Sequence, residues 1–200
     1  MNGFLRGKDV VLASNSPRRR ELMALLCEDF RVVPSDVREE IPPEASEKFT
    51  DRPFETAVYL AKLKAMDVAK HCEKAVVIGC DTVVAVDGEI LGKPSDVGDA
   101  RRMLELLSGK KHRVISGVCV VYGGAVKSFG CETLVTFREL SDGEIEDYIA
   151  SGEPFDKAGA YGIQGLGCLL STGIEGDFYN VVGFPVSKIN LRLNEFFHEK

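Results

Sequence analysis

Residues 75–91 read AVVIGCDTVVAVDGEIL, and this stretch decides how the rest of the chain can be arranged. The apolar run over 75–86 is typical of a buried strand. The dipeptide Asp87-Gly88 is a strong hairpin signal, and 89–91 reads as the returning strand. Asp81 interrupts the apolar run, so the centre of the expected sheet is a buried strand that carries a carboxylate.

Outward from this hairpin, strand and helix patterns alternate on the N-terminal side, and a long antiparallel pair follows on the C-terminal side. The sequence predicts strands at 10–13, 30–33, 113–122, 125–137 and 168–170, and helices at 17–27, 53–72, 95–107, 141–152 and from 185 onward. A polar stretch with several prolines separates the second strand from the second helix and reads as a loop over 34–53. This pattern predicts an α/β protein with a mixed twisted sheet and flanking helices. Residues 1–200 contain no internal repeat or clear linker and are expected to form a single domain.

Two predicted helices carry features that bear on function. The helix over 17–27 should bury Leu22, Leu25 and Leu26. The helix over 53–72 has an apolar stripe, and Lys64 falls inside it. A lysine in that place either extends outward to solvent or has an anionic partner.

Composition excludes several classes of protein. The chain has 200 residues and a formal net charge of −6, which disfavours broad nucleic-acid binding and an RNA-binding module. No apolar run approaches the ~18–20 residues of a membrane span, and residues 1–9 lack the apolar core of a signal peptide. The protein is therefore expected to be soluble and cytoplasmic, with a small molecule rather than a membrane or nucleic acid as its partner.

Cysteine and histidine show no metal-site spacing. The six cysteines include no C-x-x-C pair and are expected to be small buried hydrophobic residues in a reducing compartment. The three histidines, His71, His112 and His198, are expected at helix ends or on the surface rather than in catalysis. A zinc site is not predicted.

The first strand leads into an unusual helix start. Ser16 and Pro17 read as the N-cap and the first helical position, and three arginines follow at 18–20. Cations are unfavourable at the positive end of a helix unless an anion lies between the cations and the helix end. The hydroxyls of Ser14 and Ser16, the free amides and the guanidinium groups of Arg18 and Arg19 together predict a phosphate cradle. The alternative is a solvated basic turn, and neither a Walker A loop nor a G-x-G-x-x-G motif is present.

Two further positions are candidates for chemistry. Asp81 is expensive to bury without a partner, so it is either a structural aspartate in a hydrogen-bond network or a base placed near a metal. Lys93 follows the hairpin, and the returning strand carries it back toward Asp81. Taken alone, Lys93 could equally be a surface lysine.

The third candidate region is the glycine-rich stretch over 153–165. Glycines at 159, 162 and 165 permit close approach of the backbone to a ligand. The charged residues Asp156 and Lys157 precede them, and Lys157 is a candidate phosphate ligand. Gln164 has both a donor and an acceptor, which suits the edge of a nucleobase. The alternative is a glycine-rich turn with a buried ion pair.

These pieces together resemble one family. The motifs are LASNSPRR at 12–19, DTVV at 81–84, LGKP at 91–94, DKAGAYGIQG at 156–165 and NVVGFP at 180–185. In this order they resemble the Maf family of nucleoside triphosphate pyrophosphatases, although the family more often has leucine at the position of Phe184. The resemblance implies an elongated fold of two lobes around a central cleft, shared with the inosine triphosphate pyrophosphatases. It also implies hydrolysis of a nucleoside triphosphate to the monophosphate and pyrophosphate with a divalent metal, Mg²⁺ or Mn²⁺, and a homodimer.

The resemblance also assigns roles by motif position. Asp81 matches the family's proton acceptor, and the three substrate-specificity positions fall on Arg18, Thr82 and Gln164. Glu39, Lys64 and Lys93 match its other polar groups, with the metal near Glu39 and Asp81; Glu40 is the alternative to Glu39.

The residues at the specificity positions select a subfamily. They resemble the dTTP/UTP type, with modified pyrimidine triphosphates as further expected substrates. The alternatives are a 7-methyl-GTP pyrophosphatase and a non-catalytic nucleotide-binding regulator of cell division.

Overall fold

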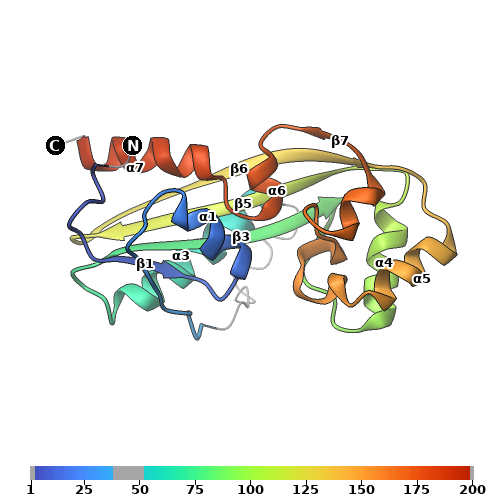
Figure 1. The fold of residues 1–200 in the computed structure, drawn as a ribbon, viewed down its shortest axis with the longest axis horizontal. Helices are drawn as coiled ribbons and strands as arrows, with labels where there is room; N and C mark the ends of the chain where they lie inside the picture. Colours follow the sequence, from blue (N-terminus) through green and yellow to red (C-terminus); the bar gives the residue numbers. More distant parts are fainter. Residues whose placement is uncertain (1–2, 38–51, 199–200) are drawn as a thin grey trace.

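The described part of the protein, residues 3–37 and 52–198 of a computed structural model, is built on a seven-stranded mixed sheet (Figure 1). Its strands lie in the order β2-β1-β3-β5-β6-β7, and β4 pairs with β3. The pairs of β1 with β2 and with β3 are parallel, and the others are antiparallel. The strands are β1 Val10–Ala13, β2 Arg31–Val32, β3 Val76–Val86, β4 Glu89–Leu91, β5 Lys111–Tyr122, β6 Ala125–Phe137 and β7 Ser171–Glu175.

Helices cover this sheet in two groups, which makes the molecule elongated (Figure 1). The helices are α1 Pro17–Ala24, α3 Pro53–Ala69, α4 Val97–Leu107, α5 Asp142–Ala150, α6 Phe178–Val182 and α7 Val186–His198, with 3₁₀ helices η1 Glu153–Asp156, η2 Ala158–Ala160 and η3 Leu166–Leu170. The terminal lobe contains α1, α3 and α7, and the distal lobe contains α4, α5 and the 3₁₀ helices. The long strands β3, β5 and β6 run through both lobes. This arrangement confirms the expected α/β fold with two lobes.

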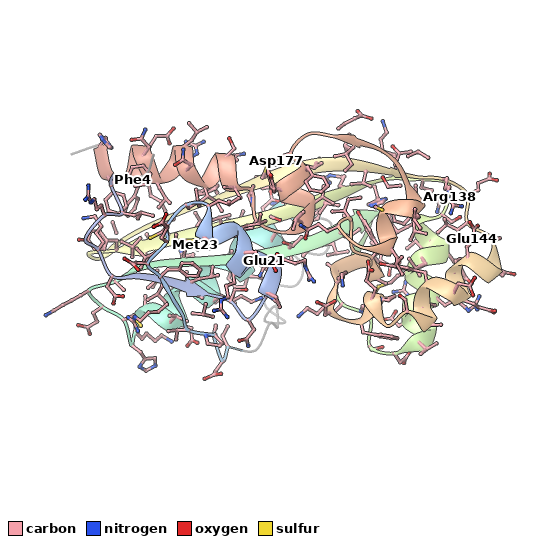
Figure 2. The ribbon with its side chains drawn as sticks, viewed as in Figure 1. Phe4, Glu21, Met23, Arg138, Glu144 and Asp177 are labelled. Atoms are coloured by element: carbon pink, nitrogen blue, oxygen red, sulfur yellow. The ribbon has the colours of Figure 1, made fainter. Side chains whose placement is uncertain are left out.

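Side chains cap the starts of α1 and α5, and the cap at Ser16 was predicted from the sequence. The side chain of Ser16 accepts a hydrogen bond from the amide of Arg19 at the start of α1, and Ser141 and Glu144 form a complete capping box at the start of α5. Glu144 also forms an ion pair with Arg138 at 2.6 Å (Figure 2). Within residues 3–37 and 52–198, no helix has the length and apolar character that crossing a bilayer would require.

Several sequence predictions were wrong in detail. Helix α1 ends at Ala24, and Leu25 is 63% exposed rather than buried, while Met23 points into the core (Figure 2). The strand predicted at 168–170 is the end of η3, and β7 begins only at Ser171. The short α6 was missed because its five residues carry no helical periodicity.

Buried polar and sulfur groups also differ from expectation. His112 was expected at a helix end or on the surface, but it lies on β5 and is 1% exposed. The six cysteines are free thiols that were all expected to be buried, but Cys27 and Cys72 are half-buried. Cys80, Cys119 and Cys131 are buried, whereas Cys168 is exposed.

The two faces of the sheet follow the two-residue period of its strands. On one face Leu12, Ile78 and Val118 pack in a core with residues of α1 and α7. On the other face Val77 and Cys119 pack against α3. Asp81 is on the α3 face and Thr82 on the opposite face, because consecutive side chains of a strand alternate.

Two glycines let α3 lie very close to the sheet. A Cβ atom on Gly79 would lie 2.6 Å from the carbonyl oxygen of Ala61, and one on Gly117 would lie 2.1 Å from the carbonyl oxygen of Ala57. Gly117 is the cross-strand partner of Asp81. The helix therefore approaches the sheet closely at the place where β3 carries its carboxylate.

One edge of β3 is left open in the middle. β5 occupies one edge of β3 along Val77–Ala85. On the other edge β1 pairs with Val76–Gly79 and β4 with Val84–Val86. Among the described residues, 80–83 therefore have no strand partner on that edge, and this opening positions the site described next.

Candidate functional site

A cleft of about 880 Å³ lies between the two lobes, against the open edge of β3. It gathers residues that the sequence placed far apart: Ser14, Ser16, Arg18, Arg19, Lys64, Asp81, Thr82, Lys93, Lys157 and Gln164. These are all the predicted site residues except Glu39, which lies outside the described residues, as does Glu40. The structure thus brings the candidates together, while the role of each stays a prediction.

Asp81 and Lys64 form a buried ion pair at one wall of the cleft. The Lys64 Nζ atom donates a hydrogen bond to Asp81 Oδ1 at 2.6 Å, and the two side chains are only 13% and 8% exposed. Of the two alternatives for a lysine within the apolar stripe of α3, Lys64 therefore has the anionic partner. The close approach of α3 at Gly117 allows the pair to form, because it brings the lysine from the helix to the strand.

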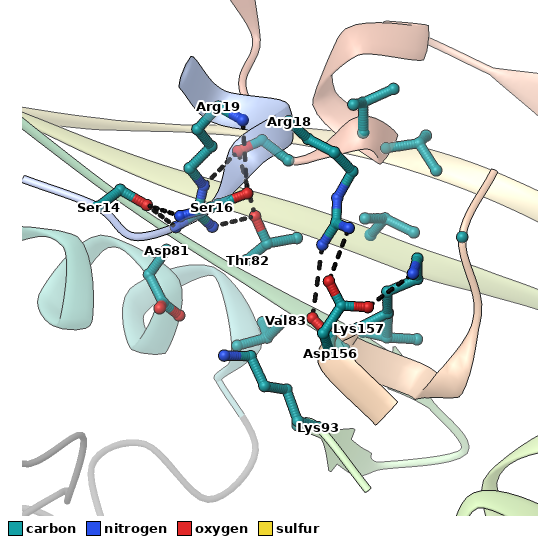
Figure 3. A pocket seen from close by; sticks show the side chains of 18 of the residues that line it. Ser14, Ser16, Arg18, Arg19, Asp81, Thr82, Val83, Lys93, Asp156 and Lys157 are labelled. Atoms are coloured by element: carbon teal, nitrogen blue, oxygen red, sulfur yellow. Dashed lines mark hydrogen bonds and ion pairs between the residues drawn. The ribbon is translucent and has the colours of Figure 1, made fainter. Parts of the chain in front are cut away.

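Arg19 braces the floor of the cleft from the other face of β3. Its guanidinium donates to the carbonyl oxygens of Cys80 at 2.7 Å and Gly183 at 2.9 Å. It also donates to Thr82 Oγ1 at 3.0 Å and Ser14 Oγ at 3.3 Å (Figure 3). The carbonyl of Cys80 lies on the open edge of β3, so Arg19 takes the place of a neighbouring strand there. Phosphate binding by Arg19 stays a prediction, since most of its donors already have protein partners.

Arg18 bridges the two lobes. Its Nη1 atom lies 2.8 Å from Asp156 Oδ2, and the other carboxylate oxygen of Asp156 accepts a hydrogen bond from Lys157 at 2.6 Å (Figure 3). Burial raises the pKa of Asp156, but the hydrogen bonds from Lys157 and Arg18 outweigh it and leave that pKa lowered. The arginine-rich helix start is therefore partly compensated by a protein carboxylate, a contact that no local sequence pattern shows.

Lys93 is the most available cation of the cleft. It is exposed, and Figure 3 shows its side chain directed into the cleft toward the wall that carries Asp81. Within residues 3–37 and 52–198 it has no ion pair. The antiparallel register pairs Leu91 with Val84, so the chain beyond β4 returns toward Thr82, as the hairpin predicted.

The glycine-rich stretch forms the distal wall, and its glycines lie close to side chains of the protein itself. A Cβ on Gly162 would lie 2.4 Å from Lys157 Cε, and one on Gly165 would lie 2.2 Å from Glu153 Oε2. Gly159 has a φ of 69° and packs against Val84. The closest groups to these glycines are thus side chains of the protein itself. Gln164 is exposed at the cleft.

A buried polar group beneath the cleft was missed by sequence reasoning. Asn180 is fully buried and accepts a hydrogen bond from the Ser116 amide at 3.2 Å. Its own amide donates to Val114 O and Thr133 Oγ1, each at 3.0 Å. Ser116 Oγ in turn lies 2.9 Å from Thr82 Oγ1. The signal available in the sequence was a polar asparagine at the start of the motif NVVGFP.

Comparison with known proteins places the chain in a family. The family model of Maf-like proteins matches residues 9–196. The chain belongs to the Maf family. Among the relatives of this Maf protein is the dTTP/UTP pyrophosphatase of Thermococcus gammatolerans, 52% identical over 180 residues that make up 90% of this chain and 92% of the relative. The dTTP/UTP pyrophosphatase of Pyrococcus furiosus is 46% identical over 192 residues, 96% of this chain and 97% of the relative.

A solved structure supports the fold of this Maf protein. The Ham1 protein of Staphylococcus aureus aligns with a TM-score of 0.52 and 18% sequence identity, over 96% of this chain and all of that one. At that identity the likeness concerns the fold alone.

Proposed function

We propose that this Maf protein is a nucleoside triphosphate pyrophosphatase that hydrolyses dTTP and UTP to the monophosphate and pyrophosphate. The observation that carries the proposal is a single cleft in which Lys93, Arg18 and the Asp81–Lys64 pair lie together in an otherwise acidic chain. The names of relatives that align over almost their whole length support the same activity.

The proposed reaction uses Asp81 as the general base. Asp81 accepts a proton from a water molecule whose oxygen attacks the α-phosphorus. The bond between the α-phosphorus and the α,β-bridging oxygen breaks, and the electron pair leaves with pyrophosphate. General base assistance typically contributes ~10²–10⁴-fold in rate.

Cations offset the charge that develops on the departing pyrophosphate. Lys93 is directed into the cleft without an ion pair in the described part of the chain, so it can bind a phosphate oxygen without first breaking a protein contact. Lys64 is already aligned with Asp81 at 2.6 Å. Groups that are oriented before the reaction stabilise the transition state without reorganising during it.

The donor set suits a divalent cation held jointly with substrate. Mg²⁺ prefers oxygen ligands and is commonly bound through one or two carboxylates together with substrate phosphates. Asp81 provides one carboxylate in the cleft, and Glu39 would be the second by resemblance. Bound there, Mg²⁺ or Mn²⁺ would neutralise charge on the phosphate oxygens.

The test is pyrophosphate release from a panel of ribonucleoside and deoxynucleoside triphosphates, with Mg²⁺, with Mn²⁺ and with EDTA. The panel includes 7-methyl-GTP. We expect dTTP and UTP to have the highest kcat/KM and EDTA to abolish turnover. Binding of dTTP without release of pyrophosphate would contradict the proposal in favour of a regulator.

The Asp81→Asn variant tests the assigned base. We expect a folded protein whose kcat for dTTP falls by ~10²-fold or more, the lower range for a lost general base. Asp87→Asn is the matched control, because it removes a carboxylate on the exposed hairpin that pairs only with Lys110 among the described residues. Turnover at the parent rate in Asp81→Asn would show that another group is the base.

A further inference from the structure

Glu153 lies at the start of η1, and its carboxylate collects hydrogen bonds from the glycine-rich loop. Its Oε2 atom accepts from the amide of Leu166 at 2.8 Å, and Oε1 accepts from the amide of Gly167 at 3.3 Å and from the hydroxyl of Tyr148 at 2.9 Å. The hydroxyl of Tyr148 accepts from the amide of Gly162 at 3.0 Å. Burial raises the pKa of Glu153, yet the hydrogen bonds from these groups leave it lowered.

The loop is shaped around this carboxylate. A Cβ on Gly165 would overlap Glu153 Oε2 at 2.2 Å, and one on Gly167 would lie 2.8 Å from the Tyr148 hydroxyl. A Cβ on Gly162 would lie 2.9 Å from Glu153 Oε1. Gly162 and Gly165 of the motif therefore let the backbone lie against Glu153, and Gly167, just beyond the motif, lets it lie against Tyr148.

The fixed amides lie on both sides of Gln164. Gly162 is two residues before it, and Leu166 and Gly167 are two and three residues after it. Gln164 itself is exposed to the cleft, and no hydrogen bond to its amide is found among residues 3–37 and 52–198. Its direction therefore depends on the backbone that carries it.

We propose that Glu153 is a positioning residue for substrate selectivity, which acts by clamping the loop 162–167 so that Gln164 faces the base of the nucleotide. This rests on the proposed function for its substrate, a nucleoside triphosphate with a pyrimidine base. A loop with glycines at 162, 165 and 167 loses much conformational entropy on ordering. Because Glu153 orders the loop in the free protein, the binding free energy of the substrate is not reduced by that loss of entropy.

The experiment compares Glu153→Gln with the parent protein. Whichever way the new amide turns, its NH₂ group faces the N–H of Leu166 or of Gly167, so one loop contact is lost. A hydrogen bond to a charged group is worth about tenfold in an equilibrium constant at the lower end of its range. We expect KM for dTTP to rise about tenfold with kcat within about threefold, and the preference for dTTP over dCTP, dATP and dGTP to fall by a similar factor.

Glu146→Gln is the matched control. It makes the same chemical change in the distal lobe, but Glu146 is exposed and pairs only with Arg101 among the described residues, so the kinetics should stay at the parent values. Tyr148→Phe provides a second route if Glu153→Gln folds poorly. It removes the hydroxyl that links Glu153 to Gly162 and should shift KM and selectivity in the same direction by less.

Hydrogen exchange measured without nucleotide separates the clamp from the reaction. In Glu153→Gln, exchange of the amides over 162–167 should quicken about tenfold while those of β3 and β5 keep the parent rates. Parent exchange rates in the loop, or a lower kcat with unchanged KM and selectivity, would overturn the positioning role. If the parent protein releases no pyrophosphate from dTTP or UTP, the proposed function is wrong, and the exchange result alone then decides whether Glu153 clamps the loop.

Discussion

Lowering the pH from 7.5 to 4.5 should destabilise the protein through His112. The imidazole is 1% exposed, and its Nε2 atom lies 2.8 Å from the hydroxyl of Tyr161. Its Nδ1 atom has no hydrogen-bond partner in the part of the chain that the structure describes. The rings of Phe137 and Tyr161 surround it at centroid distances of 4.9 Å and 5.4 Å. A protonated imidazole would therefore be a buried cation with one N–H group unsatisfied.

The magnitude follows from the shifted pKa. Burial lowers the pKa of His112 from 6.5 to about 4. The unfolded chain then binds a proton more readily than the folded one, so the stabilisation is complete above pH 6.5 and is lost as the pH falls toward 4. By pH 4.5 the loss amounts to about 2.5 kcal/mol in the free energy of unfolding.

Urea unfolding at several pH values measures this loss. Carboxylates also titrate at the lower end of the range, so the comparison is with His112→Gln, which keeps a hydrogen-bonding group near Tyr161 and cannot be protonated. Between pH 7.5 and 4.5 the parent should lose about 2.5 kcal/mol more than the variant. Equal losses in the two proteins would refute the reasoning.

Two further predictions concern the cleft. Lys93→Ala should raise KM for dTTP about tenfold while the free energy of unfolding stays within about 0.5 kcal/mol, whereas Lys74→Ala, at an exposed lysine outside the cleft, should alter neither. If the KM of Lys93→Ala equals that of the parent protein, Lys93 does not take part in substrate binding. Gly117→Ala should cost about 3 kcal/mol in thermal unfolding or prevent folding, because its Cβ would lie 2.1 Å from Ala57 O. Gly173→Ala is its control, since no atom of residues 3–37 or 52–198 lies within 4 Å of the added Cβ; equal stability of the two variants would show that α3 does not press on the sheet there.

Features that depend on local pattern could be predicted from the sequence. The hairpin at Asp87-Gly88, the cap at Ser16 and the apolar stripe of α3 each have a short-range cause, and each is present. An anionic partner for Lys64 was one of two predicted outcomes, because a lysine inside an apolar stripe requires an anion or a route to solvent. The hairpin and the family resemblance also predicted that Asp81 and Lys93 belong to the same site.

Features that depend on long-range contacts could not be predicted. Arg19 reaches Cys80 and Gly183, which are 61 and 164 positions away along the chain, and no local rule distinguishes Arg19 from the neighbouring Arg18. Glu153 looked like an ordinary charge before a proline, since the amides it binds are 13 and 14 residues away. His112 was misplaced because a histidine next to lysines at 110 and 111 reads as surface, while the alternation of β5 turns it inward.

The unbroken course of β3, β5 and β6 through both lobes restricts how the molecule can open and close. Hinge closure of two lobes requires a few loop residues whose backbone torsion angles change by a large amount. Here three hydrogen-bonded strands cross from one lobe to the other, with no such pivot along them. Rotation of one lobe relative to the other must therefore flex this ribbon elastically, with a small change shared over many residues.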